Sequence, residues 1–322
     1  MKTLLGSIIA GTALLTSWFP GDVSGQNVLI MPDSSNNRLV AFNPVNGAVL
    51  NSNMFALGGG TPVHAIQVGN EIWVSEQIGD RVSRWSFGGD FLGAITGLDN
   101  VRGMALVENT VYVTNAGAAN GAPGNAVVMY STSGTLMGSF ANALAPSPFA
   151  ILAHQGGLLV ASSSANDDIH RFTLTGTSIG TFHNSAALNF VEQLAFASNG
   201  TILAAGFTSN NIAFLDPNNG NIVSSFTASG ARGVFQLGNG NILWTSGAGT
   251  FIHDFEHEHF DARVFRRRSV YRYGEYPGAL HGRDLRHGRV AARLPRGALA
   301  SFKKAATAGV TPFDIRFRPV PA

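Results

Sequence analysis

The sequence predicts an all-β fold, a six-bladed β-propeller, from three observations. Only 12% of the 322 residues are charged whereas glycine occupies 39 positions, a composition that suits short strands and tight turns better than long amphipathic helices. A short apolar segment recurs six times along the chain. The spacing of its copies is close to the length of one propeller blade, so we expect six blades.

The recurring segment is the expected second strand of each blade. Its copies begin 44, 39, 47, 44 and 40 residues apart, at Val28–Ile30, Ile72–Val74, Val111–Val113, Leu158–Val160, Ile202–Ala204 and Ile242–Trp244. A period of about 40 to 45 residues with several short strands per unit is typical of β-propellers.

Each unit adds the same parts in the same order. An innermost strand is expected eight to ten residues before the second strand, at His64–Ile66, Arg102–Met104, Phe149–Ile151, Glu192–Leu194 and Arg232–Val234. A third strand follows through a polar loop, and a turn such as Asn46-Gly47 or Asn219-Gly220 leads to the fourth. These turn residues accept the positive φ that a tight hairpin needs.

The N-terminal residues predict a secretory signal peptide over residues 1–25. Met1 and Lys2 precede the apolar stretch Leu4–Leu15, and small residues follow at Val23–Gly25. A short membrane anchor is the alternative, but a membrane span needs about 20 apolar residues. We therefore expect an exported chain that is secreted, periplasmic or at the cell surface, with no membrane span in its mature part.

The first unit lacks an innermost strand, because the predicted signal peptide ends where that strand would lie. Thr311–Ile315 reads like Ser147–Ile151, the start of the fourth unit. We therefore expect a strand within residues 309–322 to close the ring over the blades at 26–250, which would remove an open sheet edge.

The repeated units resemble the blades of secreted bacterial propellers in the broad group of NHL-repeat, senescence-marker/gluconolactonase-like and streptogramin-lyase-like proteins. The resemblance covers roughly residues 27–250. Because the group includes both enzymes and binding modules, it implies an architecture and not an activity. WD40 repeats are not expected, since neither their Gly-His nor their Trp-Asp signature recurs.

The composition changes at residue 251. Residues 1–250 carry 7 Lys/Arg and 12 Asp/Glu, whereas the remainder carries 14 and 7, so the basic character belongs to the tail and predicts no nucleic-acid partner. For residues 251–308 we consider a functional basic insertion, a disordered arm or a stretch translated out of frame. We favour the last two, because the sixth blade is expected to lose its third strand there.

The candidate site follows from propeller geometry, because the starts of the innermost strands surround one opening. At this position the six units present His64, Arg102, Phe149, Glu192, Arg232 and Phe313. The two arginines are suited to clamp a carboxylate or phosphate, and Glu192 or His64 to move a proton. The alternative is an ion-paired, water-filled channel in which Glu192 neutralises one arginine.

We therefore expect a monomeric ligand- or protein-binding module without a cofactor, whose partner is a small anionic ligand, a glycan or a protein. The predicted ligand-binding residues are His64, Arg102, Phe149, Glu192 and Arg232.

The alternative function, implied by the resemblance, is a metal-assisted lactonase or lyase at the central channel. Its catalytic candidates are His64 and Glu192, and its cofactor would be a divalent cation such as Ca²⁺ or Mg²⁺. Glu192, His253 and His257 are the candidate metal ligands, although a solvated charged run is the favoured interpretation of the two histidines. Whether the chain is an enzyme stays open.

Overall fold

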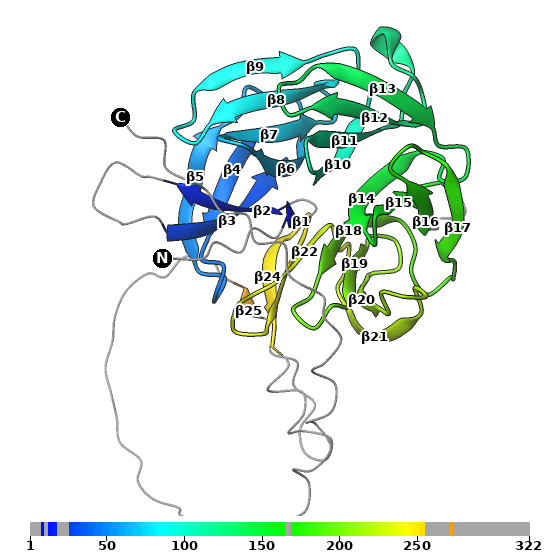
Figure 1. The fold of residues 1–322 in the computed structure, drawn as a ribbon. Helices are drawn as coiled ribbons and strands as arrows, with labels where there is room; N and C mark the ends of the chain where they lie inside the picture. Colours follow the sequence, from blue (N-terminus) through cyan, green and yellow to red (C-terminus); the bar gives the residue numbers. More distant parts are fainter. Residues whose placement is uncertain (1–7, 10–11, 18–25, 165–168, 255–270, 273–322) are drawn as a thin grey trace, which may run out of the picture. The chain divides into compact units, whose positions relative to one another are not determined.

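The computed structural model describes residues 8–9, 12–17, 26–164, 169–254 and 271–272. All of them belong to one of two compact units, Ser7–Arg272. The described residues form six antiparallel sheets, which confirms the all-β six-bladed propeller (Figure 1).

Each sheet is a simple meander in which sequence order is also spatial order. The first contains β1 (Ile8–Ile9), β2 (Thr12–Ser17), β3 (Gln26–Asp33), β4 (Arg38–Phe42) and β5 (Val49–Ala56). The second contains β6 (Pro62–Val68), β7 (Glu71–Glu76), β8 (Arg81–Ser86) and β9 (Phe91–Ile95). The third contains β10 (Val101–Val107), β11 (Thr110–Asn115), β12 (Ala126–Ser131) and β13 (Leu136–Ala141), with the 3-10 turn η1 (Ala119–Gly121) between β11 and β12.

The remaining three sheets repeat this plan. The fourth contains β14 (Pro148–His154), β15 (Gly157–Ser162), β16 (Ile169–Thr173) and β17 (Ser178–His183). The fifth contains β18 (Val191–Phe196), β19 (Ile202–Gly206), β20 (Asn211–Leu215) and β21 (Ile222–Thr227). The sixth contains β22 (Gly233–Gln236), β23 (Ile242–Ser246), β24 (Gly249–His253) and β25 (Tyr271–Arg272).

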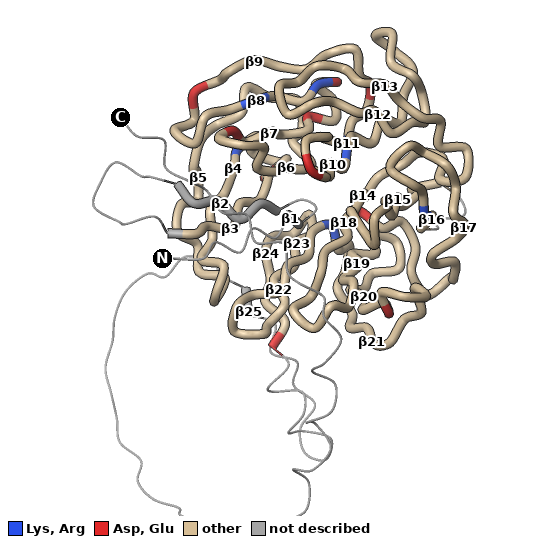
Figure 2. The backbone as a smooth tube through the Cα atoms, in the orientation of Figure 1, with Lys and Arg blue, Asp and Glu red and all other residues tan. Residues whose placement is uncertain are grey.

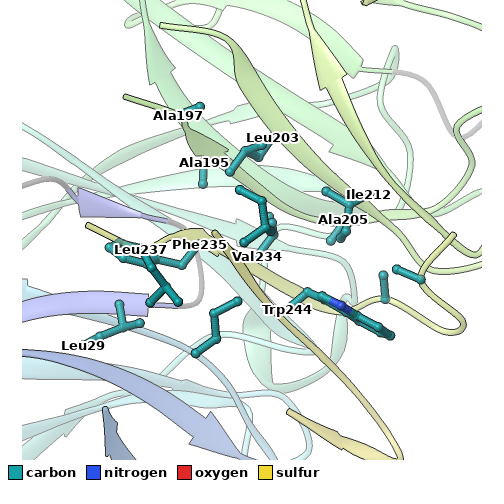
Figure 3. Packing of buried hydrophobic residues seen from close by; sticks show 14 of the residues in the cluster. Leu29, Ala195, Ala197, Leu203, Ala205, Ile212, Val234, Phe235, Leu237 and Trp244 are labelled. Carbon is teal, nitrogen blue, oxygen red and sulfur yellow. The ribbon is translucent and has the colours of Figure 1, made fainter. Parts of the chain in front are cut away.

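The hydrophobic core lies between successive blades. The innermost strands contact one another in the order β6, β10, β14, β18 and β22, and β22 and β6 each contact β2 of the first sheet. Figure 3 shows one of the clusters between them, in which Leu29, Leu203 and Val234 come from three different sheets. Neighbouring residues of one strand enter different clusters, as Leu158 and Leu159 of β15 do, so packing on both faces of each sheet holds the blades together.

A left-handed residue precedes each innermost strand of the second to sixth blades. These residues are Thr61, Asn100, Ser147, Phe190 and Gly230, with φ values of 59°, 55°, 52°, 51° and 61°. In four of these blades the ladder to the second strand shifts register just after this residue, so the strand begins with a bulge. Bulges re-aim side chains, and here they turn the second strand residue out of the ladder.

At its two ends the propeller departs from the sequence prediction. The strand that pairs with β3, in the place of the innermost strand of the other blades, is β2, which pairs Ala13 with Ile30 and Ser17 with Gln26, and the two-residue β1 pairs with β2 beyond it. Both β1 and β2 lie within the predicted signal peptide, and cleavage after Gly25 would leave β3 innermost. Thr311–Ile315 lies outside the described residues, so the signal peptide and the C-terminal closing strand both stay predictions.

The expected loss of the third strand in the sixth blade was wrong. β24 pairs with β23 from Ile242↔His253 to Ser246↔Gly249, three residues past the expected end of the repeat. Phe251 stabilises this strand by stacking on Trp244 at 4.4 Å between ring centroids. Apart from the described residues 251–254 and 271–272, the segment 251–308 lies outside the structure's description. None of the helices among the described residues has the length and apolar character that a membrane crossing requires.

Candidate functional site

Four of the five predicted ring residues within the described part lie in one connected cluster. The second residue after each left-handed position is Val63, Arg102, Phe149, Glu192 or Arg232 in blades two to six. Arg102, Phe149, Glu192 and Arg232 are therefore structurally equivalent. Phe313, the sixth expected member, lies outside the described residues.

Arg102 forms the buried end of this cluster, with only 7% of the residue exposed. Its Nη1 donates hydrogen bonds to the Ser147 and Ser163 hydroxyls at 3.0 and 2.7 Å and to the Ser147 and Pro148 carbonyls at 3.1 and 3.3 Å. Its guanidinium carbon lies 4.8 Å from the centre of the Phe149 ring. Among the described residues Nη2 has no hydrogen-bond partner, so this group keeps donors for a ligand.

Glu192 and Arg232 form the more open end. Nη1 of Arg232 donates to both carboxylate oxygens of Glu192 at 3.0 Å, while Nε and Nη2 of Arg232 have no partner among the described residues. The Glu192 side chain is 6% exposed and that of Arg232 47%. A buried carboxylate is thus paired with an arginine that still faces solvent.

Three phenyl rings connect the two arginines. Phe149 meets Phe190 edge to face at 5.5 Å between centroids, and Phe190 meets Phe207 in the same way at 5.3 Å. The guanidinium carbon of Arg232 lies 4.4 Å from the centre of the Phe207 ring. Each guanidinium is therefore held against an aromatic ring, which fixes its position without consuming its hydrogen-bond donors. We call Arg102, Glu192, Arg232 and the three phenylalanines the guanidinium–phenyl cluster.

The electrostatics of this cluster are set by burial. Burial raises the pKa of the Glu192 carboxyl to about 7, although the nearby Arg232 and Arg102 guanidinium groups act to lower it. Burial also lowers the pKa of Arg102 to about 10, against the opposing attraction of Glu192. Charged residues are sparse elsewhere on the described blades (Figure 2). Around neutral pH the cluster carries one or two net positive charges, which favours an anion.

His64 lies one residue beyond the equivalent position, which Val63 occupies. Its backbone N–H donates to the Ser75 hydroxyl at 3.1 Å, as the N–H of Gly103 does to Thr114 at 2.7 Å, so the equivalent of His64 is Gly103. The imidazole Nδ1 accepts a hydrogen bond from the Met104 N–H of the next blade at 2.7 Å. Burial lowers the pKa of His64 to about 3, which keeps the ring neutral.

A bridge between blades is the role that these contacts give His64. Gln193 stands at the same position in the fifth blade, and its Oε1 accepts from the Val234 N–H at 2.7 Å. In both cases a side chain accepts a hydrogen bond from the backbone of the innermost strand of the following blade. The predicted proton-transfer role of His64 has no geometric support in these contacts.

A divalent cation does not fit the cluster. Both oxygens of Glu192 accept from Arg232, and Arg102 adds a second positive charge close by. Within the described part of the chain no three His, Asp or Glu side chains come together as a metal site. His253 lies in β24, and its ring stacks on that of Phe226 with 3.7 Å between the ring centroids. His257 lies outside the described residues.

Sequence reasoning missed Phe190 and Phe207, as well as the serines that hold Arg102. The missed signal is positional: the left-handed positions hold Thr, Asn, Ser and Gly in the other blades, and a phenylalanine stands out among them.

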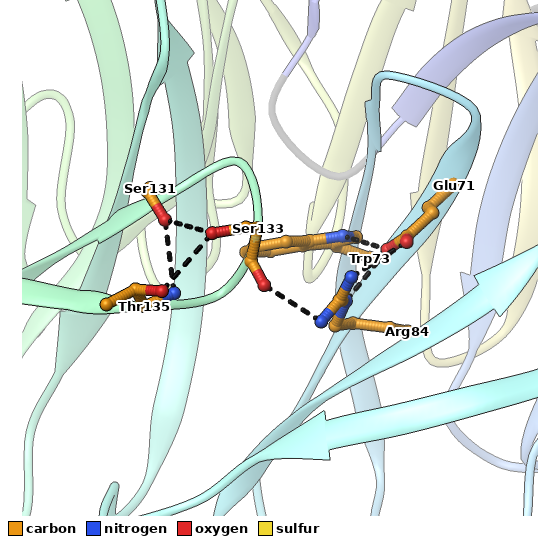
Figure 4. A network of polar contacts seen from close by, with 6 residues as sticks. All are labelled: Glu71, Trp73, Arg84, Ser131, Ser133 and Thr135. Atoms are coloured by element: carbon orange, nitrogen blue, oxygen red, sulfur yellow. Dashed lines mark hydrogen bonds and ion pairs between the residues drawn. The ribbon is translucent and has the colours of Figure 1, made fainter.

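Another Arg–Glu pair lies in the second blade, outside the guanidinium–phenyl cluster, and provides a contrast (Figure 4). Nε and Nη2 of Arg84 donate to the two oxygens of Glu71 at 2.8 and 2.7 Å, and the Trp73 indole N–H donates to Glu71 at 2.8 Å. Nη1 of Arg84 donates to the Ser133 carbonyl of the next blade at 3.0 Å. This pair joins two blades.

Comparison with solved structures confirms the fold. A virginiamycin B lyase from Staphylococcus aureus, in a structure with quinupristin, is 15% identical over 72% of this chain and 77% of its own, with a TM-score of 0.51. A gluconolactonase-like protein is 14% identical over 77% and 88%, with a TM-score of 0.58. A chain of the nidogen/laminin complex is 13% identical over 71% and 90%, with a TM-score of 0.60. The chain shares the fold of the group that its blades resemble.

Neither sequence comparison narrows the function. The WD40 domain of anaphase-promoting complex subunit 4 matches residues 158–245, less than half of the chain and without the two WD40 signatures. No curated protein matches. At these identities the likeness establishes architecture and carries no activity to this chain.

Proposed function

We propose that this propeller binds a small anionic ligand at the guanidinium–phenyl cluster. The observation that carries the proposal is the pair of guanidinium groups, Arg102 and Arg232, that keep free donors on either side of a buried carboxylate. Charge-assisted hydrogen bonds from arginine are well suited to a carboxylate or phosphate.

Arg232 is the residue through which the proposal is most directly tested. Inorganic phosphate and benzoate serve as probes, with affinity measured by calorimetry or by NMR titration. Since a hydrogen bond to a charged group contributes about 1.5–3 kcal/mol, Arg232→Ala should weaken binding about tenfold or more. Arg84→Ala removes another glutamate-paired arginine, outside the cluster, and should leave affinity unchanged. Equal affinity of Arg232→Ala and the parent, or no binding of either probe, would reject the proposal.

A lactonase or lyase activity is the second candidate, and the pKa of Glu192 favours it. A carboxyl whose pKa is about 7 is matched to general acid or base work at neutral pH. Hydrolysis of a simple aldonolactone, followed with and without added Ca²⁺, tests this candidate. A rate that falls at least a hundredfold in Glu192→Gln supports it, and turnover indistinguishable from buffer removes it.

We also propose that binding takes place outside the cytoplasm, because residues 1–25 have the pattern of a signal peptide. Mass spectrometry of the N-terminus of the protein recovered from a secreting host tests this proposal. A start near Gln26 supports export, and a retained Met1 contradicts it.

A further inference from the structure

The fifth blade carries an exception to the repeat at two neighbouring positions. In the fourth blade Ser163 N–H donates to the Ser147 carbonyl at 3.0 Å, and in the fifth blade Phe207 N–H donates to the Phe190 carbonyl at 2.9 Å. The same bond joins Gln77 and Thr61 in the second blade at 2.9 Å. The equivalent pairs are therefore polar in two blades and aromatic in the fifth.

The polar pair of the fourth blade holds Arg102 through hydrogen bonds. The Ser147 and Ser163 hydroxyls lie 2.9 Å apart, and both accept from Arg102. The aromatic pair of the fifth blade makes no such bonds. It lies between Arg102 and Arg232, where it places apolar surface next to two guanidinium groups.

Phe190 differs from its equivalents in its side chain. Its φ is 51°, and the equivalent Thr61, Asn100 and Ser147 share this left-handed conformation, so the conformation belongs to the repeat and the bulky side chain is what sets Phe190 apart. Phe190 and Phe207 are both only half-buried, whereas Phe149 is 5% exposed, so packing alone does not account for two phenyl rings here.

We infer that the anion bound by the cluster is an aromatic carboxylate, whose ring lies against Phe190 and Phe207 while its carboxylate meets Arg232. This inference rests on the proposed anion-binding function and adds the class of ligand. A ring next to two half-buried phenyl groups would gain edge-to-face contact and remove apolar surface from water, in addition to the ion pair.

The matched probes are benzoate and acetate, which share a carboxylate and differ by the ring. We expect the parent protein to bind benzoate at least about tenfold more tightly than acetate, because about 1.4 kcal/mol of ring contact gives that ratio. Phe190→Ser installs the residue that stands at the equivalent position of the fourth blade. It should bring the two affinities within about twofold, with the acetate affinity unchanged.

Phe91→Ser is the control, because this phenylalanine is 53% exposed on β9 and lies outside the cluster. It should keep the full benzoate preference. Phe207→Ser supplies an independent second variant, and urea unfolding confirms that each variant is folded. Equal affinity for benzoate and acetate in the parent, or a preference that survives both Phe190→Ser and Phe207→Ser, would overturn the inference while leaving the anion site. Absence of binding by either carboxylate and by phosphate would instead remove the proposed function.

Discussion

Two of the Arg–Glu pairs among the described residues, Glu71–Arg84 and Glu192–Arg232, use the same residue types and reach opposite electrostatic states. The pair between Glu71 and Arg84 has two guanidinium nitrogens on two carboxylate oxygens, and its side chains are 23% and 24% exposed. Its hydrogen bonds lower the pKa of Glu71 and raise that of Arg84. In the other pair a single nitrogen of Arg232 serves both oxygens of Glu192, and burial raises the pKa of Glu192 to about 7.

The difference shows that the geometry of an Arg–Glu pair determines whether its groups are fully hydrogen-bonded or keep donors for a ligand. Glu71 and Arg84 satisfy each other, Trp73 and the next blade, so this pair joins structural elements and leaves nothing for a ligand. Glu192 is more deeply buried and less completely bonded, and its partner keeps free donors. Protonation of Glu192, or replacement of its ion-pair partner by a ligand, therefore requires less free energy than the same change at Glu71.

The largest expected effect is the pH dependence that Glu192 gives to folding. Its pKa is about 7 in the folded protein and 4.5 in its ordinary state, so the folded protein holds this proton more tightly and stability falls as pH rises from about 4.5 to about 7. Glu192→Gln removes this loss. The stability of Glu192→Gln relative to the parent should therefore increase from pH 5 to pH 8, by up to about 3 kcal/mol.

Urea unfolding of both proteins at the two pH values measures this change. A stability difference between the two proteins that is the same at pH 5 and pH 8 would contradict the raised pKa and with it the contrast between the two glutamates.

An intermediate effect is expected at His64, which is buried and whose Nδ1 accepts a hydrogen bond from the next blade. His64→Ala leaves the Met104 N–H without its acceptor and should lower the free energy of unfolding by about 2 kcal/mol at pH 7. His64→Gln should recover most of that loss, because Gln193 makes the same bond to the next blade. The pKa of His64 lies at about 3, so its contribution is complete above about 6.5 and declines as pH falls toward 3.

Thermal and urea unfolding of the two His64 variants test whether the hydrogen bond to the next blade is the source of this stability. Equal destabilisation by alanine and glutamine would show that the bridge is not the source of the stability. A loss of benzoate binding in a folded His64→Gln protein would place His64 in the ligand site after all.

The smallest effect is expected at Glu71. Because its folded pKa is lowered, its contribution is present above its ordinary pKa of 4.5 and is lost as pH falls through the lowered value. Glu71→Gln should reduce stability by about 1 kcal/mol at pH 7 and progressively less in acid, the opposite trend to Glu192→Gln. If both variants showed the same trend with pH, the distinction between the two pairs would be lost.

The repeat period predicted the blades because each strand has its own apolar pattern and each turn its own glycine or asparagine. Arg102, Glu192 and Arg232 were predictable for the same reason, since equivalent positions of a ring converge. His64 was misplaced by one residue because a bulge at the strand start does not show in the sequence. Whether an arginine pairs through one nitrogen or two also depends on tertiary geometry, so the different states of Glu71 and Glu192 required the structure.

The most direct test of the contrast is an NMR titration of the side-chain carboxyl carbons, with Glu192→Gln and Glu71→Gln used to assign the two signals. Glu192 should titrate at about pH 7, and Glu71 below its ordinary value of 4.5. A Glu192 signal that titrates at or below 4.5 would show a satisfied, structural ion pair, and the guanidinium–phenyl cluster would lose its claim to be a ligand site.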